Sequence, residues 1–251
     1  MREFDAAASF GPDIAARYDE TPRGDESAAA QFLSELAGEG RALEFAIGTG
    51  RIALPLQGHG VSVDGIELSP DMVDVLRRKP GGEQLHVVVG DMSAASTGSR
   101  YDLVYLVFNT IFNLQTADAQ VRCFENAARH LAPGGVFVVE TALPHAWIAP
   151  GKEGYVVAEG IESDAVQLGV ARYDPATQLF QECHVRIGAV RNEFAPLLLR
   201  LITPGEMDLM ARIAGLELVD RFANWERGAF GVHSREHVSV YGWRGDHGGV
   251  D

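Results

Sequence analysis

The sequence predicts an α/β fold with a mostly parallel sheet, and three observations support this. Apolar runs of strand length alternate with helix-like segments over the first 140 residues. Several of these runs are almost continuously apolar, as expected of parallel strands that helices cover on both faces. After residue 150 the apolar runs follow one another with turns but without long helical patterns, which indicates an antiparallel segment.

The parallel part is built from strands that alternate with helices, an order that implies right-handed crossovers. A helix is predicted after the second strand, where Ser69 is the N-cap and Pro70 takes the first helical position. A later helix carries Val121 and Phe124 on one apolar stripe and ends at Pro133-Gly134-Gly135, which turns into the next strand. The expected strands are residues 42–47, 61–66, 85–89, 101–108 and 136–141.

The second half predicts an antiparallel insertion at residues 152–202, followed by a closing unit at 203–243. Thr203 and Glu206 stand at the N-cap and capping-box positions of a helix that stops at Gly215. Two strands, 216–225 and 237–244, follow this helix. The insertion strands are expected at residues 155–161, 165–173, 178–187 and 197–202.

Composition limits the classes of function. The chain has 251 residues, 46% of them hydrophobic, and a formal net charge of -14. An acidic surface repels nucleic acids and anionic lipids, so neither is expected as a partner. Two cysteines, Cys123 and Cys183, indicate a reducing compartment without a disulfide framework. With no signal peptide and no stretch of membrane-spanning length expected, the sequence predicts a cytoplasmic protein that acts on a small molecule.

A Gly-rich turn follows the first strand, in "LEFAIGTG" (43–50). A P-loop is excluded because the required lysine and hydroxyl residue are missing, and the dinucleotide fingerprint is weakened because Arg51 replaces its third glycine. What remains is Glu44 followed by Ala46, Gly48 and Gly50. Small residues let the backbone pass close beneath a ligand. A nearby carboxylate repels phosphate but attracts an ammonium or sulfonium group.

Two further acids follow the next two strands. Glu67 comes nineteen residues after Gly48, where an acid can accept both ribose hydroxyls of a nucleoside. Asp91 follows the third strand and could accept from an adenine amino group, while the Met92 amide could meet a ring nitrogen. Because the carboxyl ends of parallel strands share one edge, all of these groups are expected in one crevice.

Taken together, these motifs resemble those of the class I S-adenosylmethionine-dependent methyltransferases. The segments that match in order and spacing are "LEFAIGTG" (43–50), "GIELS" (65–69), "GDM" (90–92), "YDLVYLVFNTIFNL" (101–114) and "LAPGG" (131–135). The resemblance implies one Rossmann-like α/β domain over residues 1–251, with a cofactor-binding core at 15–145. Its seven-stranded, mostly parallel sheet has helices on both faces and a reversed last strand. The chain departs from the family at Ala46, where glycine is usual.

The resemblance also assigns the cofactor, S-adenosylmethionine, to particular residues. Glu44 and the backbone from Ala46 to Gly50 would hold its methionine part. An N-terminal "YD" segment is typical of small-molecule members, so Tyr18 would cover the cofactor and Arg23 would pair with its carboxylate. The expected cofactor-binding residues are Tyr18, Arg23, Glu44, Ala46, Gly48, Gly50, Glu67, Leu68, Asp91, Met92 and Phe108.

The expected reaction is methyl transfer to an amine or a hydroxyl of a small molecule by in-line displacement, with alignment and exclusion of water as the main contributions. His145 is the candidate base and Asn109 the candidate positioning residue, with Thr110 and Asn113 beside it. No spacing of His, Asp and Glu demands a metal, so metal-independent transfer is expected.

The acceptor side and the competing functions remain open at this level. The insertion is expected to cover the acceptor site, with Tyr155, Tyr173 and Phe180 lining it, or to form the interface of a homodimer. Its layout resembles methyltransferases that act on amino sugars of antibiotics. The alternatives are an NAD(P)-dependent oxidoreductase and a non-catalytic cofactor-binding module.

Overall fold

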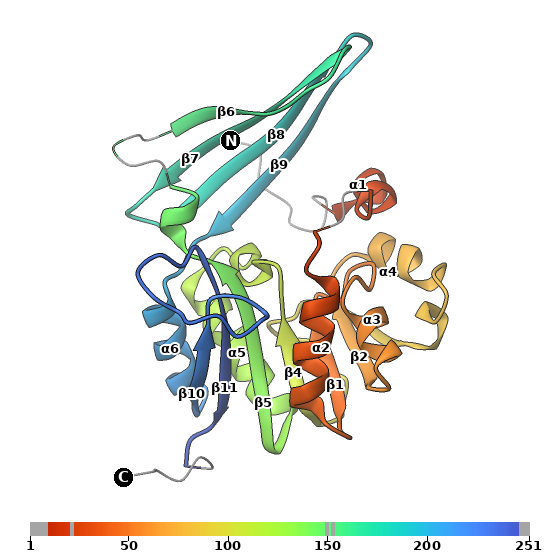
Figure 1. Ribbon diagram of the computed structural model, residues 1–251, viewed down its shortest axis with the longest axis vertical. Coiled ribbons are helices and arrows are strands. Elements are labelled where there is room, and N and C mark those ends of the chain that lie inside the picture. The colour runs from red at the N-terminus through yellow and green to blue at the C-terminus, as the bar shows by residue number, and fades with distance from the viewer. Residues whose placement is uncertain (1–9, 21–22, 149–150, 152–153, 246–251) are drawn as a thin grey trace.

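The computed structural model describes residues 10–20, 23–148, 151 and 154–245. They form a seven-stranded sheet with helices on both faces and a separate four-stranded sheet that stands beyond one edge of it (Figure 1). Within the described part of the chain, no helix has both the length and the apolar character needed to cross a membrane.

The large sheet has the strand order β3-β2-β1-β4-β5-β11-β10. The first five strands pair in parallel, whereas β11 is antiparallel to both of its neighbours. The predicted mostly parallel sheet with a reversed last strand is confirmed. Its strands are β1 (Arg41–Phe45), β2 (Ser62–Glu67), β3 (His86–Val89), β4 (Tyr101–Leu106), β5 (Leu131–Ala142), β10 (Leu216–Phe222) and β11 (Glu236–Trp243).

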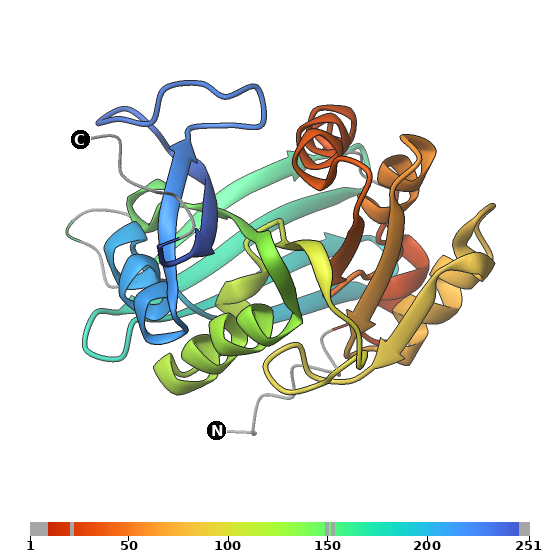
Figure 2. The same cartoon turned by 90° about the horizontal axis from the view of Figure 1, so that it is seen from below.

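Helices bury an apolar core on each face of this sheet (Figure 2). On one face α2 (Glu26–Ala37) contributes Phe32 and Leu33 beside α3 (Ala53–Gly58). On the other face α5 (Ala117–His130) contributes Phe124, beside Met207 of α6 (Pro204–Ile213). The remaining helices are α1 (Pro12–Arg17), α4 (Pro70–Arg77), η2 (Gly82–Gln84), η3 (Thr110–Asn113) and η4 (Pro144–Ala146).

The local signals that predicted two helix starts are confirmed. The Ser69 hydroxyl accepts the Met72 amide at 3.3 Å at the start of α4. At the start of α6, Thr203 and Glu206 form a complete capping box. Such reciprocal bonds satisfy amides that the first helical turn leaves without partners.

The predicted turn at Pro133-Gly134-Gly135 does not separate α5 from the next strand in the way expected. The strand β5 already begins at Leu131, which pairs with Tyr101, and the register then shifts before Val136 pairs with Leu103. The three residues thus form an irregularity inside β5. Gly135 is needed there, because a Cβ atom would lie 2.9 Å from the Tyr101 carbonyl oxygen.

The four-stranded sheet is the expected antiparallel insertion after β5. Its strands pair in chain order: β6 (Gly154–Ile161), β7 (Ala165–Asp174), β8 (Leu179–Gly188) and β9 (Asn192–Arg200). The fourth strand differs from the one expected at 197–202, because β9 begins at Asn192, includes Pro196 and ends at Arg200. As an edge strand, β9 tolerates a proline that has no amide to donate.

Candidate functional site

The Gly-rich turn between β1 and α3 has an unusual backbone. Ala46, Gly48 and Gly50 all have positive φ angles, of 53°, 57° and 80°. A Cβ atom at Gly50 would lie 2.4 Å from Leu76 Cδ1 of α4. Glycine at position 50 is therefore required both by the backbone and by the close approach of α4, whereas Ala46 holds a conformation that glycine adopts more easily.

Glu67 ties this turn to the end of β2. Its side chain is buried, and its carboxylate accepts the amides of Gly48 and Ser69, both at 2.8 Å. Burial raises the pKa of Glu67, while these backbone donors oppose the rise. A carboxylate held in this way has its direction fixed and keeps further lone pairs for a ligand.

Glu44 lies deeper, at the end of β1. It is 3% exposed, and Tyr105 donates its hydroxyl to Glu44 Oε2 at 2.9 Å. Burial raises the pKa of Glu44 to about 8, and the bond from Tyr105 and the charge of Arg51 act in the opposite direction. A positive charge placed near a buried carboxyl group of this kind stabilises its ionised form.

A cavity of about 330 Å³ opens at the carboxyl ends of the parallel strands. Five of the expected cofactor residues line it: Ala46, Glu67, Leu68, Asp91 and Met92. Phe10 and the residues around η3, including Thr110 and Asn113, complete its wall. This placement is the ligand crevice expected of an open parallel sheet.

The remaining expected residues surround that cavity without lining it. Tyr18 is half-buried, and its ring lies 6.5 Å from that of Phe10. The Arg23 guanidinium stacks 5.1 Å from the Tyr18 ring and 4.8 Å from the Phe108 ring. Cation–π contacts of Arg23 therefore join the segment before α2 to the loop after β4. Thr21 and Pro22, within the "YD" segment, lie outside the described residues.

The two expected catalytic residues are placed differently from one another. Asn109 has a positive φ of 62°, and its Oδ1 accepts the Ala142 amide, so this side chain holds the loop after β4 against β5. Beside it, the Phe108 amide donates to the buried carboxylate of Glu140, and burial raises the Glu140 pKa to about 7. His145 is exposed on η4 and does not line the cavity.

Sequence reasoning missed a cluster on the insertion. Glu159, Glu182 and His184 bring their ligand atoms within 4.8 Å of one another. His184 Nδ1 lies 2.8 Å from Glu159, and Nε2 lies 3.6 Å from Glu182. Glu159 reaches across β7 because Gly169 has no side chain, where a Cβ atom would lie 2.4 Å from Glu159 Oε1. The alternation of Glu182 and His184 predicts a shared face. Only the folded structure reveals Glu159 beside them, because it lies at the irregularity between Ala158 and Gly160 of β6.

This cluster lies on the face of the insertion that packs against the large domain. Phe180 precedes Glu182 on the same face of β8, and it belongs to the main core with Ala171 and Leu199. A cavity of about 200 Å³ lies between α1 and the insertion, and Ile14, His184 and Phe194 are among the residues that line it.

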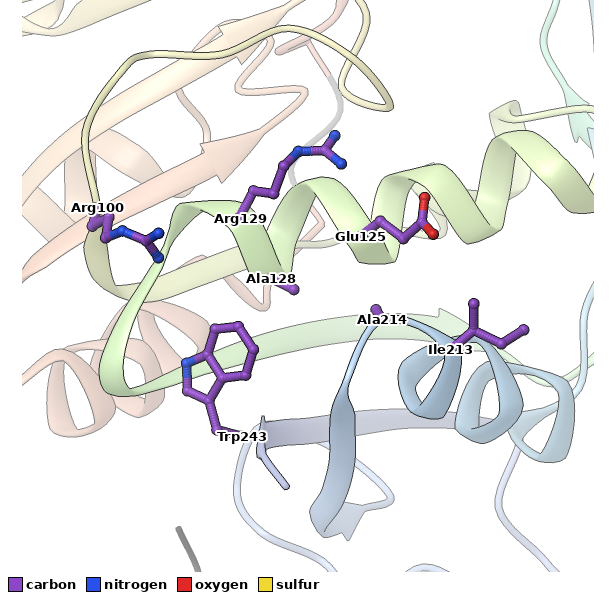
Figure 3. A pocket seen from close by; sticks show the side chains of 7 residues that line it. All are labelled: Arg100, Glu125, Ala128, Arg129, Ile213, Ala214 and Trp243. Carbon is purple, nitrogen blue, oxygen red and sulfur yellow. The ribbon is translucent and has the colours of Figure 1, made fainter. Parts of the chain in front are cut away.

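A third cavity lies at the opposite edge of the large sheet. It has a volume of about 390 Å³ and is lined by Arg100, Arg129 and Trp243, among others (Figure 3). These residues stand at the start of β4, the end of α5 and the end of β11. The amino edge of a parallel sheet is not where ligands of such folds bind.

Comparison with known proteins decides the family. Residues 42–135 match the model of a methyltransferase domain. The solved CcbJ methyltransferase from Streptomyces caelestis is 38% identical, aligns over 95% of this chain and 98% of its own, and has a TM-score of 0.88. The chain belongs to the class I S-adenosylmethionine-dependent methyltransferases.

Two further relatives extend this comparison. The cypemycin N-terminal methyltransferase of a Streptomyces species is 26% identical over 198 residues, which are 79% of this methyltransferase and 81% of that protein. The structure of CalS10 with S-adenosylmethionine bound is that of an amino pentose methyltransferase from Micromonospora echinaspora. It is 25% identical and covers 96% of this chain and 98% of its own, with a TM-score of 0.68.

The methyltransferase therefore takes its methyl group from S-adenosylmethionine. The family decides against the NAD(P)-dependent oxidoreductase and the non-catalytic module that the sequence left as alternatives.

Proposed function

We propose that this methyltransferase methylates an amine on a small natural product or amino sugar. The observation that carries the proposal is the charge on the inner face of the insertion. Among the described residues, His184 is the one basic side chain within ion-pair distance of Glu159 or Glu182. Two carboxylates that share one imidazole attract a cation, and an alkylammonium group is a small-molecule cation of suitable size. The relatives described above as N-terminal and amino pentose methyltransferases support an amine acceptor.

The cofactor fits the crevice by the chemistry of its donors. The buried, oriented carboxylate of Glu67 would accept the ribose hydroxyls, and Asp91 with the Met92 amide would bind the adenine. The Gly-rich turn and Glu44 would hold the methionine end. When bound, the cofactor supplies a sulfonium methyl group with a good leaving group, so the chain has to align the acceptor and exclude water.

The insertion would cover the acceptor. It stands beyond the carboxyl edge of the large sheet, and α1 lies below its far end (Figure 1). Arg17 of α1 binds Glu193 of β9 at 2.7 Å, which ties the N-terminal segment to the insertion. Tyr155, Tyr173 and Phe180 would contact the apolar part of the acceptor. Glu182 and His184 would hold its ammonium group. An imidazole is also a suitable group to accept the proton that an amine must lose before it attacks.

The outer face of the same sheet supports a homodimer. Apolar side chains pair across it in rows, such as Val156 with Val170 and Val185 with Phe194. Val156 is 63% exposed and Phe194 is 67% exposed. Contiguous exposed apolar surface of this kind marks an interaction site. In this proposal the inner face of the insertion covers the acceptor, and its outer face binds a second copy of the chain.

A labelled-methyl assay over matched pairs of amines and alcohols tests the acceptor class. Transfer to the amines is expected, and transfer to the alcohols alone would contradict the proposal. For the best amine, Glu182→Gln is expected to raise KM by about 10-fold, since one charge-assisted contact is lost, with a smaller change in kcat. Glu217→Gln, on β10 at the far edge of the large sheet, is the matched control and should leave KM unchanged.

A further inference from the structure

Arg51 occupies an unusual position directly after the Gly-rich turn. Its side chain is 13% exposed. One terminal nitrogen, Nη1, binds Asp25 and lies 3.4 Å from Glu26, at the start of α2. The guanidinium group also lies 5.0 Å from the centre of the Phe108 ring. Two carboxylates and one aromatic ring thus fix the direction of this side chain.

The second terminal nitrogen of Arg51 has no such partner. Nη2 is buried and makes no hydrogen bond with any residue that the structure describes. A buried charged donor without an acceptor is costly, so natural proteins rarely keep one without a reason. Because Nη1 is already held by two carboxylates, rotation of the group to satisfy Nη2 would break existing ion pairs.

The charges around Arg51 indicate what could meet Nη2. Glu44 lies near enough for the charge of Arg51 to lower its pKa, but it does not bond with Nη2. The turn between them, from Ala46 to Gly50, is where the proposed cofactor placement puts an amino-acid group. Such a group carries a carboxylate and an ammonium, which match an arginine donor and a glutamate acceptor on either side of it.

We propose that Arg51 Nη2 donates a hydrogen bond to the α-carboxylate of the cofactor's methionine end, while Glu44 faces its ammonium group. This proposal rests on the proposed placement of the cofactor at the Gly-rich turn. It gives the carboxylate to Arg51 in place of Arg23, whose guanidinium stacks between the rings of Tyr18 and Phe108. In this proposal the arginine that replaces the third glycine of a dinucleotide fingerprint selects a carboxylate.

Two ligands that differ only at this end provide the test. S-adenosylhomocysteine carries the amino-acid group, and 5′-methylthioadenosine keeps the nucleoside thioether without it. Calorimetry on the full chain is expected to show that Arg51→Gln raises the Kd of S-adenosylhomocysteine about 10-fold and that of 5′-methylthioadenosine less than about 2-fold. Arg51→Lys keeps the charge and should show the same selectivity with a smaller loss.

The control is Arg227→Gln, because Arg227 also binds a glutamate of α2, Glu35 at 2.8 Å, and stacks on Phe32. It should change neither Kd. An equal loss of both ligands in Arg51→Gln and Arg51→Lys would show that Arg51 only holds α2 against the turn, and the proposal would be overturned. Unchanged binding of S-adenosylhomocysteine would also overturn it. Turnover with amines tests the acceptor separately and does not enter either binding constant.

Discussion

The Tyr105 hydroxyl donates a hydrogen bond of 2.9 Å to Glu44 Oε2 across two adjacent, buried parallel strands. Neither side chain reaches solvent appreciably, at 0% and 3% exposure. The bond fixes the carboxyl group beneath the Gly-rich turn. The sheet interior thus orients a group whose partner in the proposed function is the cofactor.

Tyr105→Phe removes this donor and leaves a buried carboxyl group without it. The free energy of unfolding is expected to fall by about 1–3 kcal/mol, and the pKa of Glu44 to rise further. Urea unfolding of the two proteins measures the first effect. Equal stability of Tyr105→Phe and the wild type would show that another group compensates for the lost hydroxyl.

The stability of the cofactor-free enzyme should fall as the pH rises from about 6.5 to about 8. Burial raises the pKa of Glu140 to about 7 and that of Glu44 to about 8, both from 4.5. A carboxyl with a raised folded-state pKa contributes its full stability below 4.5 and loses it as the pH rises from 4.5 to the folded value, so the loss from Glu44 ends near pH 8. His237 acts below this window, because burial lowers its pKa from 6.5 to about 4.

Urea midpoints at several pH values measure this slope. Glu140→Gln cannot ionise and should reduce the slope below about pH 7, while Glu44→Gln should reduce it there as well and remove it between about pH 7 and 8. A wild-type midpoint that stays constant or rises across this window would contradict the prediction.

Glu67→Ala is expected to weaken S-adenosylhomocysteine binding by about 1–3 kcal/mol, because the ribose hydroxyls lose their acceptor. The variant also removes the acceptor of the Gly48 and Ser69 amides, so some loss of thermal stability should accompany it. Calorimetry measures the affinity, with Asp74→Asn on the exposed side of α4 as the control. Unchanged affinity would remove Glu67 from the proposed site.

Much of the fold could be predicted because its signals are local. The caps at Ser69 and Thr203 depend on residues within one turn of helix. The mostly parallel sheet follows from apolar runs that alternate with helical segments. The position of the crevice could be predicted as well, since Glu67 and Asp91 each come at the end of a strand and parallel strands end at one edge.

The features of the site that the sequence did not predict depend on contacts between distant segments. The ion pair of Arg51 joins it to Asp25, and Glu159 meets His184 across an intervening strand through a gap at Gly169. Neither contact is indicated by the residues close to it in the sequence. Asn109 illustrates the reverse case, because a polar residue beside the expected site uses its side chain to hold the backbone of Ala142.

Ala46→Gly tests the strain at the Gly-rich turn. Ala46 has a φ of 53°, which disfavours residues with a Cβ atom by about 1–2 kcal/mol, while glycine loses about 0.5–1 kcal/mol of backbone entropy on folding. The free energy of unfolding should therefore rise by up to about 1 kcal/mol. Ala53→Gly in α3, where the backbone is helical, should lower it. A loss of stability in Ala46→Gly similar to that of the control would show that the turn stores no strain.

The outer face of the insertion provides the last prediction, which rests on the proposed homodimer. Phe194→Asp replaces an apolar side chain that is 67% exposed, near the start of the edge strand β9, with a charged one. Because burying an unpaired carboxylate between two apolar faces is unfavourable, the variant is expected to be monomeric at concentrations where the wild type is dimeric. Sedimentation velocity measures the oligomeric state of the variant and of the wild type. Val232→Asp changes an 87% exposed residue in the loop between β10 and β11 and should leave the dimer intact. A wild-type protein that sediments as a monomer throughout would contradict the assignment of this face to a second copy.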